Sequence, residues 1–214
     1  MKDSDLKQAV LDELQWEPSV NAAHIGVTAK DGVVTLTGDV GSYAEKLAAE
    51  RAAGRVYGVK GVAEEINVRY PFDKLDDTDI AQKALQALSW DVEVPQNKVS
   101  VKVEDGWVTL SGTVDWHFQS SAAEADVRKL KGVIGVINNI TIKPSVQASD
   151  VRAKLKAAFE RNSEIEEENI TVSVDGGKVT LSGHVDTWNQ DCLAVDTAWS
   201  APGVTQVEDL LTIG

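Results

Sequence analysis

This sequence of 214 residues has one cysteine, Cys192, and no apolar run long enough to cross a membrane. A single cysteine cannot form a disulfide within the chain, so packing and hydrogen bonds must hold the fold. Charges interrupt every long apolar stretch, and the start, MKDSDLKQAV, lacks the apolar segment of a secretory signal peptide. We therefore expect a cytoplasmic location for the chain as given, or a periplasmic one if a removed signal peptide preceded it.

Basic residues are scarce. The chain has 21 Lys and Arg against 34 Asp and Glu, for a net charge of −13, and residues 147–214 hold only 5 basic against 12 acidic side chains. An acidic surface repels phosphate backbones and anionic lipid headgroups. These charges exclude nucleic acid as an expected partner, and electrostatic attraction would not drive membrane binding.

The sequence also lacks the usual arrangements of catalytic and metal-binding residues. The three histidines, His24, His117 and His184, have no metal-ligand spacing. No serine or cysteine lies in a nucleophile-elbow context, and the glycines match neither a phosphate loop nor a dinucleotide fingerprint. We therefore expect no catalytic residues, no bound metal and no cofactor, which makes an enzyme the least favoured class.

What the sequence does contain is a repeated string. DGVVTLTGDV at 31–40 returns as DGWVTLSGTV at 105–114 and as GGKVTLSGHV at 176–185. Shifts of 74 and then 71 residues align the surrounding positions without gaps, which predicts three copies of one small domain. The predicted domains are 1–70, 76–143 and 147–214, joined by linkers at 71–77 and 144–148 that each begin with proline.

Each copy has the pattern helix, strand, strand, helix, strand. Apolar residues recur at helical spacing in the first segment and alternate in the strands. The paired residues Asp31-Gly32, Asp105-Gly106 and Gly176-Gly177 suit the positive φ angles of a two-residue hairpin turn. The predicted class is α+β, with three tandem αββαβ two-layer sandwiches. In each, two helices pack on one face of a three-stranded mixed sheet, and a Thr-rich face stays open.

Several positions carry more specific expectations. A Ser/Thr-Asp pair suits the N-cap of each first helix: Ser4-Asp5, Thr78-Asp79 and Ser149-Asp150. Gly38 falls on the inward row of its strand, where we expect a helix to cross close to the sheet. Gly58, Gly132 and Gly203 are expected to cap the second helices at their C-terminal ends.

The order αββαβ, the D-G-x-V-T-L-x-G-x-V hairpin and the later G-V-x-x-V together resemble the BON domain family over essentially the whole chain. That family is named for bacterial osmotically inducible and nodulation-related proteins. The resemblance implies a non-catalytic binding module, linked to osmotic or envelope stress and to phospholipid surfaces. For cytoplasmic members it also implies potassium binding. The matching residues are hairpin and core residues, so they carry no ligand site over to this chain. A cytoplasmic scaffold that binds protein partners is the alternative function.

Tryptophan is the residue type most informative about a binding surface. Trp16 and Trp90 end the first helices and are expected to close the end of the core, and Trp199 is expected to pack inside. Four further aromatic residues are candidates for an exposed patch that contacts a lipid surface or a protein: Trp107, Trp116, Phe118 and Trp188. The alternative is that they pack between the tandem domains.

A monovalent-cation site is a separate hypothesis. Backbone carbonyls in glycine-bearing turns can ligate potassium, and the candidates are the turns around Gly58 and Gly61 and around Gly132 and Gly135. The third copy has Gln206 in place of the second glycine of each pair. The alternative is that these glycines only end a helix and admit a turn.

Overall fold

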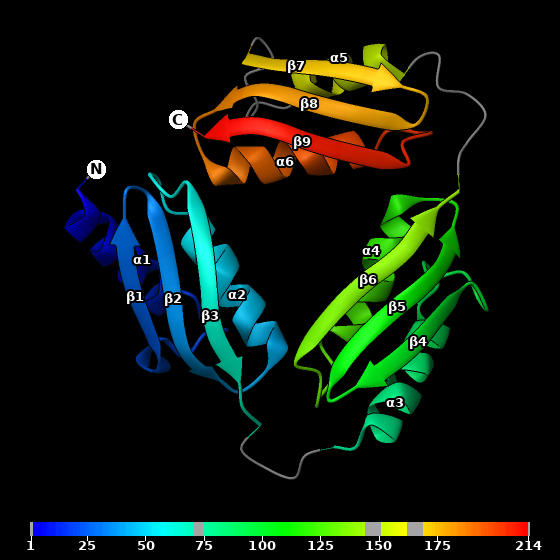
Figure 1. The fold of residues 1–214 in the computed structure, drawn as a ribbon, viewed down its shortest axis with the longest axis horizontal. Coiled ribbons are helices and arrows are strands. Elements are labelled where there is room, and N and C mark those ends of the chain that lie inside the picture. The colour runs from blue at the N-terminus through cyan, green and yellow to red at the C-terminus, as the bar shows by residue number, and fades with distance from the viewer. Residues whose placement is uncertain (1, 71–74, 144–150, 162–168, 214) are drawn as a thin grey trace. The chain divides into compact units, whose positions relative to one another are not determined.

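The computed structural model describes residues 2–70, 75–143, 151–161 and 169–213. These residues form three sheets of three strands each, with the orders β1-β2-β3, β4-β5-β6 and β7-β8-β9. Each sheet and its two helices come from one copy of the repeat, as Figure 1 shows. The predicted α+β class with three αββαβ units is confirmed. No helix in the described ranges is long and apolar enough to cross a bilayer.

The elements occur in the same order in all three repeats. Repeat one contains α1 (Asp3–Trp16), the short 3₁₀ helix η1 (Ala22–His24), β1 (Ile25–Lys30), β2 (Val33–Val40), α2 (Tyr43–Gly54) and β3 (Gly61–Val68). Repeat two contains α3 (Asp77–Trp90), β4 (Val99–Glu104), β5 (Trp107–Val114), α4 (His117–Val127) and β6 (Gly135–Ile142). Repeat three contains α5 (Val151–Arg161), β7 (Ile170–Asp175), β8 (Lys178–Val185), α6 (Trp188–Trp199) and β9 (Gln206–Ile213).

The sheets are mixed, as predicted. In repeat one β1 pairs antiparallel with β2, and β2 pairs parallel with β3 from Val33↔Gly61 to Val40↔Val68. Repeat three has the same registers. In repeat two, Ile134 N donates to Gly106 O and Lys143 N to Val114 O, which match the bonds from Lys60 N to Gly32 O and from Arg69 N to Val40 O. The offset of 28 residues between the two parallel strands is therefore common to all three copies.

Both helices of a repeat cover one face of its sheet (Figure 1). In repeat one the buried row of α1, Leu6, Val10 and Leu14, joins Val34 and Leu36 of β2 in the core. The second helix contributes small side chains, Ala49, Ala52 and Ala53, so that it can approach the sheet closely. In repeat three the core contains Val151, Leu155 and the fully buried Phe159. The alternate residues of the strands form the open, Thr-rich face.

The hairpin turns adopt the predicted conformation in two repeats. Asp31 and Gly32 have φ values of 52° and 85°, and Asp105 and Gly106 have 51° and 80°. In repeat three only Gly176, with a φ of 58°, is left-handed. A carboxylate at the start of the first helix binds the turn: Asp77 accepts from Asp105 N at 2.8 Å and from Gly106 N at 2.9 Å. Asp3 does the same for Asp31 N at 3.0 Å. The hairpins of repeats one and two are thus each tied to their own first helix.

The predicted N-caps are wrong for the first two helices. Lys2 stands at the N-cap of α1 without a side-chain bond, and Ser4 and Asp5 lie in the first turn. In repeat two Asp76 is the capping residue, because its Oδ1 accepts from Asp79 N at 2.7 Å. The third predicted pair, Ser149-Asp150, lies outside the described residues.

Since α3 begins at Asp77, the predicted linker 71–77 extends one residue too far. Its residues 71–74 and the second linker, 144–148, are also outside the described ranges.

Two glycine expectations need correction. A Cβ on Gly38 would collide with the backbone carbonyl of His24, which precedes β1, so no long helix crosses there. The second helices end at Gly54, Val127 and Trp199, four or five residues before the expected cap glycines. Gly58 is instead the third residue of a turn closed by Val59 N and Val56 O at 3.1 Å, and its φ of 93° suits glycine there.

Candidate functional site

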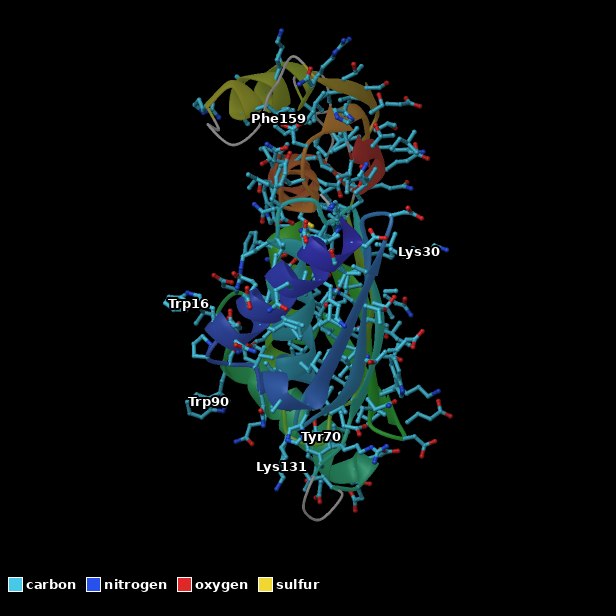
Figure 2. The ribbon with its side chains drawn as sticks, turned by 90° about the vertical axis from the view of Figure 1, so that its left-hand side faces the viewer. Trp16, Lys30, Tyr70, Trp90, Lys131 and Phe159 are labelled. Carbon is cyan, nitrogen blue, oxygen red and sulfur yellow. The ribbon has the colours of Figure 1, made fainter. Side chains whose placement is uncertain are left out.

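The most exposed tryptophans end the first helices of repeats one and two. Trp16 is 84% exposed and Trp90 is 81% exposed, and Figure 2 shows both side chains pointing away from the ribbon. The expectation that they close the core is therefore wrong. Helical phase explains the error: each follows the last buried helix residue, Leu14 or Leu88, by two positions, or about 200° around the helix. The core row and the tryptophan thus lie on opposite faces.

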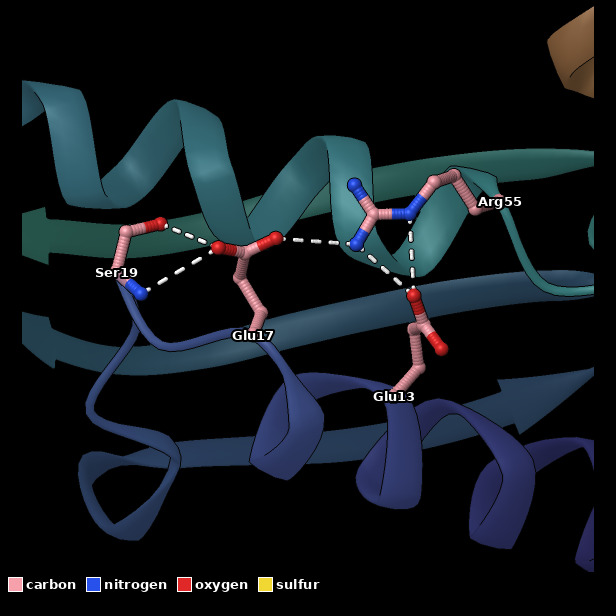
Figure 3. A network of polar contacts seen from close by, with 4 residues as sticks. All are labelled: Glu13, Glu17, Ser19 and Arg55. Atoms are coloured by element: carbon pink, nitrogen blue, oxygen red, sulfur yellow. Dashed lines mark hydrogen bonds and ion pairs between the residues drawn. The ribbon is translucent and has the colours of Figure 1, made fainter.

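A network of charged groups holds the end of α1 beside Trp16 (Figure 3). The Arg55 guanidinium, just after α2, donates to Glu13 Oε1 from Nη2 at 2.9 Å and from Nε at 3.1 Å. Its Nη2 also lies 3.1 Å from Glu17 Oε2. The other oxygen of Glu17 accepts from Ser19 Oγ at 2.7 Å and from Ser19 N at 3.3 Å. The segment on both sides of Trp16 is therefore fixed to the end of α2.

The network also sets the proton affinity of its members. The bonds from Ser19, followed by the ion pair with Arg55, hold the pKa of Glu17 below its ordinary value. The two carboxylates likewise raise the pKa of Arg55. Glu17 and Arg55 are therefore both charged at neutral pH. Their charges offset one another in part beside an exposed indole ring.

The other repeats lack this network. Repeat two has Ala87, Asp91 and Lys129 at the positions of Glu13, Glu17 and Arg55, and Arg161 replaces the tryptophan in repeat three. Next to Trp90, Asp91 Oδ1 accepts from Glu93 N at 2.7 Å. Trp16 and Trp90 are thus equally exposed but are supported by different local structures.

Replacing Arg55 with methionine is expected to loosen the Trp16 segment while the core of repeat one stays folded. Backbone hydrogen exchange of residues 17–20 should accelerate several-fold, because Glu13 and Glu17 lose the cation that binds them to α2. Exchange measured by mass spectrometry on the full chain tests this, with Lys129→Met as the matched control. Unchanged exchange in the Arg55 variant would show that the network does not order the segment.

Three of the four aromatic residues predicted for a patch belong to repeat two, where they lie at the two ends of β5. Trp107 begins β5 and Trp116 comes two residues after its end, so an eight-residue strand of about 25 Å lies between them. Trp116 and the neighbouring Phe118 are exposed at the start of α4, and the half-buried Trp188 begins α6 of repeat three. Their role in binding stays a prediction. Trp199 packs against the core of repeat three, as expected.

The predicted cation-binding glycines belong to turns and strand starts. Gly132, with a φ of 97°, lies in a turn closed by Val133 N and Leu130 O at 3.3 Å, which is the equivalent of the Gly58 turn. Gly61 and Gly135 begin β3 and β6, and the Trp107 ring covers Gly135. Within the described ranges no group of three or more His, Cys, Asp or Glu side chains is arranged to hold a metal ion. Cation binding by these glycines stays a prediction.

A half-buried polar pair between the second helix and the last strand was not identified from sequence. In repeat one Lys46 Nζ lies 3.4 Å from Glu64 Oε2, and in repeat two Asn138 Nδ2 donates to Ser120 Oγ at 2.9 Å. The equivalent residues in repeat three are Asp191 and Asp209. Burial, the charge of Asp209 and a hydrogen bond with it raise the pKa of Asp191 from 3.8 to about 6. Aligning the repeats shows a polar residue at both positions but not that the two side chains meet.

Comparison with known proteins matches all three repeats to one family. The model of the BON domain matches residues 2–70, 76–144 and 147–214. The chain is 34% identical over 152 residues to the osmotically-inducible protein Y of Escherichia coli (strain K12), covering 67% of this chain and 74% of that protein. Two solved structures of CdsD, a structural protein of the type III secretion system of Chlamydia trachomatis, match at 20% and 18% identity. They cover 98% and 100% of this chain and 92% and 100% of theirs, with TM-scores of 0.27 and 0.28.

Proposed function

The chain belongs to the BON-domain family, and on this premise we propose that it is a non-catalytic binding protein that docks on phospholipid surfaces through Trp16 and Trp90. The observation that carries the proposal is the nearly full exposure of these two indoles at equivalent positions of two repeats. Tryptophan favours the boundary between lipid and water because its ring is apolar and its N–H can bond to polar groups there.

The charges around the two anchors favour a neutral lipid surface. Glu17 follows Trp16 and Asp91 follows Trp90, and the whole chain has a net charge of −13. Insertion of an indole into a bilayer is favourable because it buries apolar surface. An anionic bilayer would in addition repel the carboxylates beside the indole. Binding should therefore be stronger to phosphatidylcholine vesicles than to vesicles rich in phosphatidylglycerol. Added salt should reduce the difference.

Replacing both anchors, as Trp16→Ser with Trp90→Ser, is expected to lower the fraction bound to phosphatidylcholine vesicles at least tenfold. Co-sedimentation measures it, and circular dichroism should show an unchanged fold because both side chains lie outside the core. Trp107→Val, which removes an exposed indole elsewhere, serves as the control and should bind like the wild type. Equal binding of the double variant and the wild type would refute docking through these residues.

We also propose a role under osmotic or envelope stress, which the similarity to the osmotically-inducible protein Y supports. The proposed location is the cytoplasm for the chain as given, or the periplasm if a signal peptide precedes it. Fractionation of cells that express the natural gene, before and after a rise in external salt, tests both points. An unchanged protein level after the salt shift would remove the stress part of the proposal.

A further inference from the structure

The open face of the sheet in repeat two carries an aromatic surface that the other repeats lack. Trp107 begins the central strand β5 and is 47% exposed. Its neighbour on β6 is Gly135, because the offset of 28 residues between these strands is the same in all three repeats. Repeat one has Val33 and Gly61 at these positions, and repeat three has Lys178 and Gln206.

The indole of Trp107 covers Gly135 with one of its faces. Cε3 and Cη2 of Trp107 are 2.5 Å and 2.7 Å from the point that a Cβ of residue 135 would occupy, and Cζ3, which joins them, is nearer still. An edge-on ring would leave the two outer atoms much farther away than the middle one. The ring therefore turns one face to the space that a side chain of residue 135 would fill. Its opposite face is turned away from that position, and Trp107 is 47% exposed.

Polar side chains share this face of the sheet with Trp107. The two-residue turn Asp105-Gly106 places Glu104 of β4 beside Trp107. Glu104 pairs with Lys102 at 2.8 Å, and both side chains are 72% exposed. Thr109 follows two residues along β5, and the exposed Ile137 lies opposite it on β6. A hydroxyl, a carboxylate and an ammonium group thus lie near a single flat apolar ring.

We propose that this face of repeat two binds the pyranose ring of an uncharged oligosaccharide, with Trp107 as the stacking platform. A pyranose ring in which the substituents are equatorial has an apolar face of C–H groups that fits a flat indole, and its hydroxyls at the edge donate and accept hydrogen bonds. Lys102, Glu104 and Thr109 supply partners of both kinds. Gly135 positions the platform, because any side chain there would lift the ring.

Charge and shape argue against other ligands with planar or apolar faces. A nucleotide would bring phosphates to an acidic chain. A proline-rich peptide docks in a groove lined by several aromatic rings, and Trp107 is the only aromatic side chain on the strands of this sheet. The residues of this surface are also different from the anchors Trp16 and Trp90 proposed for membrane docking.

The test is ¹⁹F NMR of the full chain labelled with 5-fluorotryptophan, whose six resonances are assigned by single substitutions. Titration with β-1,4-linked hexasaccharides of glucose and of N-acetylglucosamine should shift the Trp107 resonance, with a millimolar dissociation constant. Trp107→Val, which introduces the residue of repeat one, should lower the affinity at least tenfold, as followed by isothermal calorimetry. Gly135→Ala should lower it several-fold while Trp107 remains. The Trp16→Ser, Trp90→Ser variant should bind the sugars like the wild type, whatever the outcome of the vesicle experiment.

The proposal fails if neither hexasaccharide shifts Trp107 at millimolar concentration. It also fails if a proline-rich peptide or a phosphatidylcholine micelle shifts Trp107 and the sugars do not. Sugar affinity that is unchanged in Trp107→Val would place the binding elsewhere and would equally overturn it.

Discussion

Gly38→Ala is expected to lower the free energy of unfolding of repeat one by about 3 kcal/mol. Gly38 has a φ of 127°, which side-chain-bearing residues rarely adopt, and a Cβ there would coincide with the carbonyl oxygen of His24. Because that oxygen belongs to backbone, it cannot move aside without disturbing the start of β1. Gly112 and Gly183 have the same conformation and the same kind of backbone neighbour.

Hydrogen exchange of peptides from 25–68, measured on the full chain in increasing urea, gives the stability of repeat one by itself. Gly61→Ala is the matched control, because no atom lies within 4 Å of its added Cβ, and it should behave like the wild type. Equal stability of the Gly38 and Gly61 variants would contradict the steric explanation.

Repeat three is expected to gain stability from Asp191 in mild acid relative to neutral pH. The folded-state pKa of Asp191 is raised from 3.8 to about 6, chiefly by burial and then by Asp209. A raised folded pKa means that the folded form binds the proton more tightly than the unfolded form. This contribution is complete below the unfolded pKa and is lost as the pH rises through about 6. Allowing for partial exposure, it amounts to about 1–2 kcal/mol.

Asp209→Asn, which introduces the residue of repeat two at this position, should weaken that dependence and stabilise repeat three at neutral pH. Part of the dependence should remain, because Asp191 is still buried. The free energy of unfolding of repeat three is measured by urea unfolding, followed by hydrogen exchange of residues 169–213 at several pH values. Asp196→Asn, on the exposed side of α6, is the control. The informative quantity is the difference in this free energy between variant and wild type at each pH, since other carboxylates also titrate. If the two pH profiles run parallel, Asp191 and Asp209 are not coupled.

The sheets and their strand directions could be predicted because the same sequence pattern recurs in each repeat. Alternation in the strands, the hairpin glycines and the constant spacing to the last strand all point to one topology. The exposure of Trp16 was also available from sequence, since its helical phase relative to Leu14 places it outside the core. The expectation that Trp16 belongs to the core rested on its size and its place at a helix end, and neither property decides burial.

Other features depend on contacts that local patterns do not contain. Arg55 meets Glu13 and Glu17 across about 40 residues of chain, and surface ion pairs leave no periodic signal. Strand alternation placed Trp107 on the open face. The position of its ring over Gly135 depends on another strand, β6, which lies far away in the sequence. The polar pairs between second helix and last strand are likewise set by tertiary contact. Their residue types differ in every repeat, which hides them from a search for a shared motif.

Because each sheet is built from the three strands of one repeat, the chain can fold stepwise as it leaves the ribosome. The core of repeat one is complete once β3, residues 61–68, has emerged, and it needs no residue from later in the chain. Tandem domains of similar sequence risk exchanging strands when they are unfolded together. Sequential completion limits that risk, because the earlier hairpin is already paired when the next similar one is synthesised. Refolding of the whole chain from denaturant offers no such order and exposes all three hairpins at once.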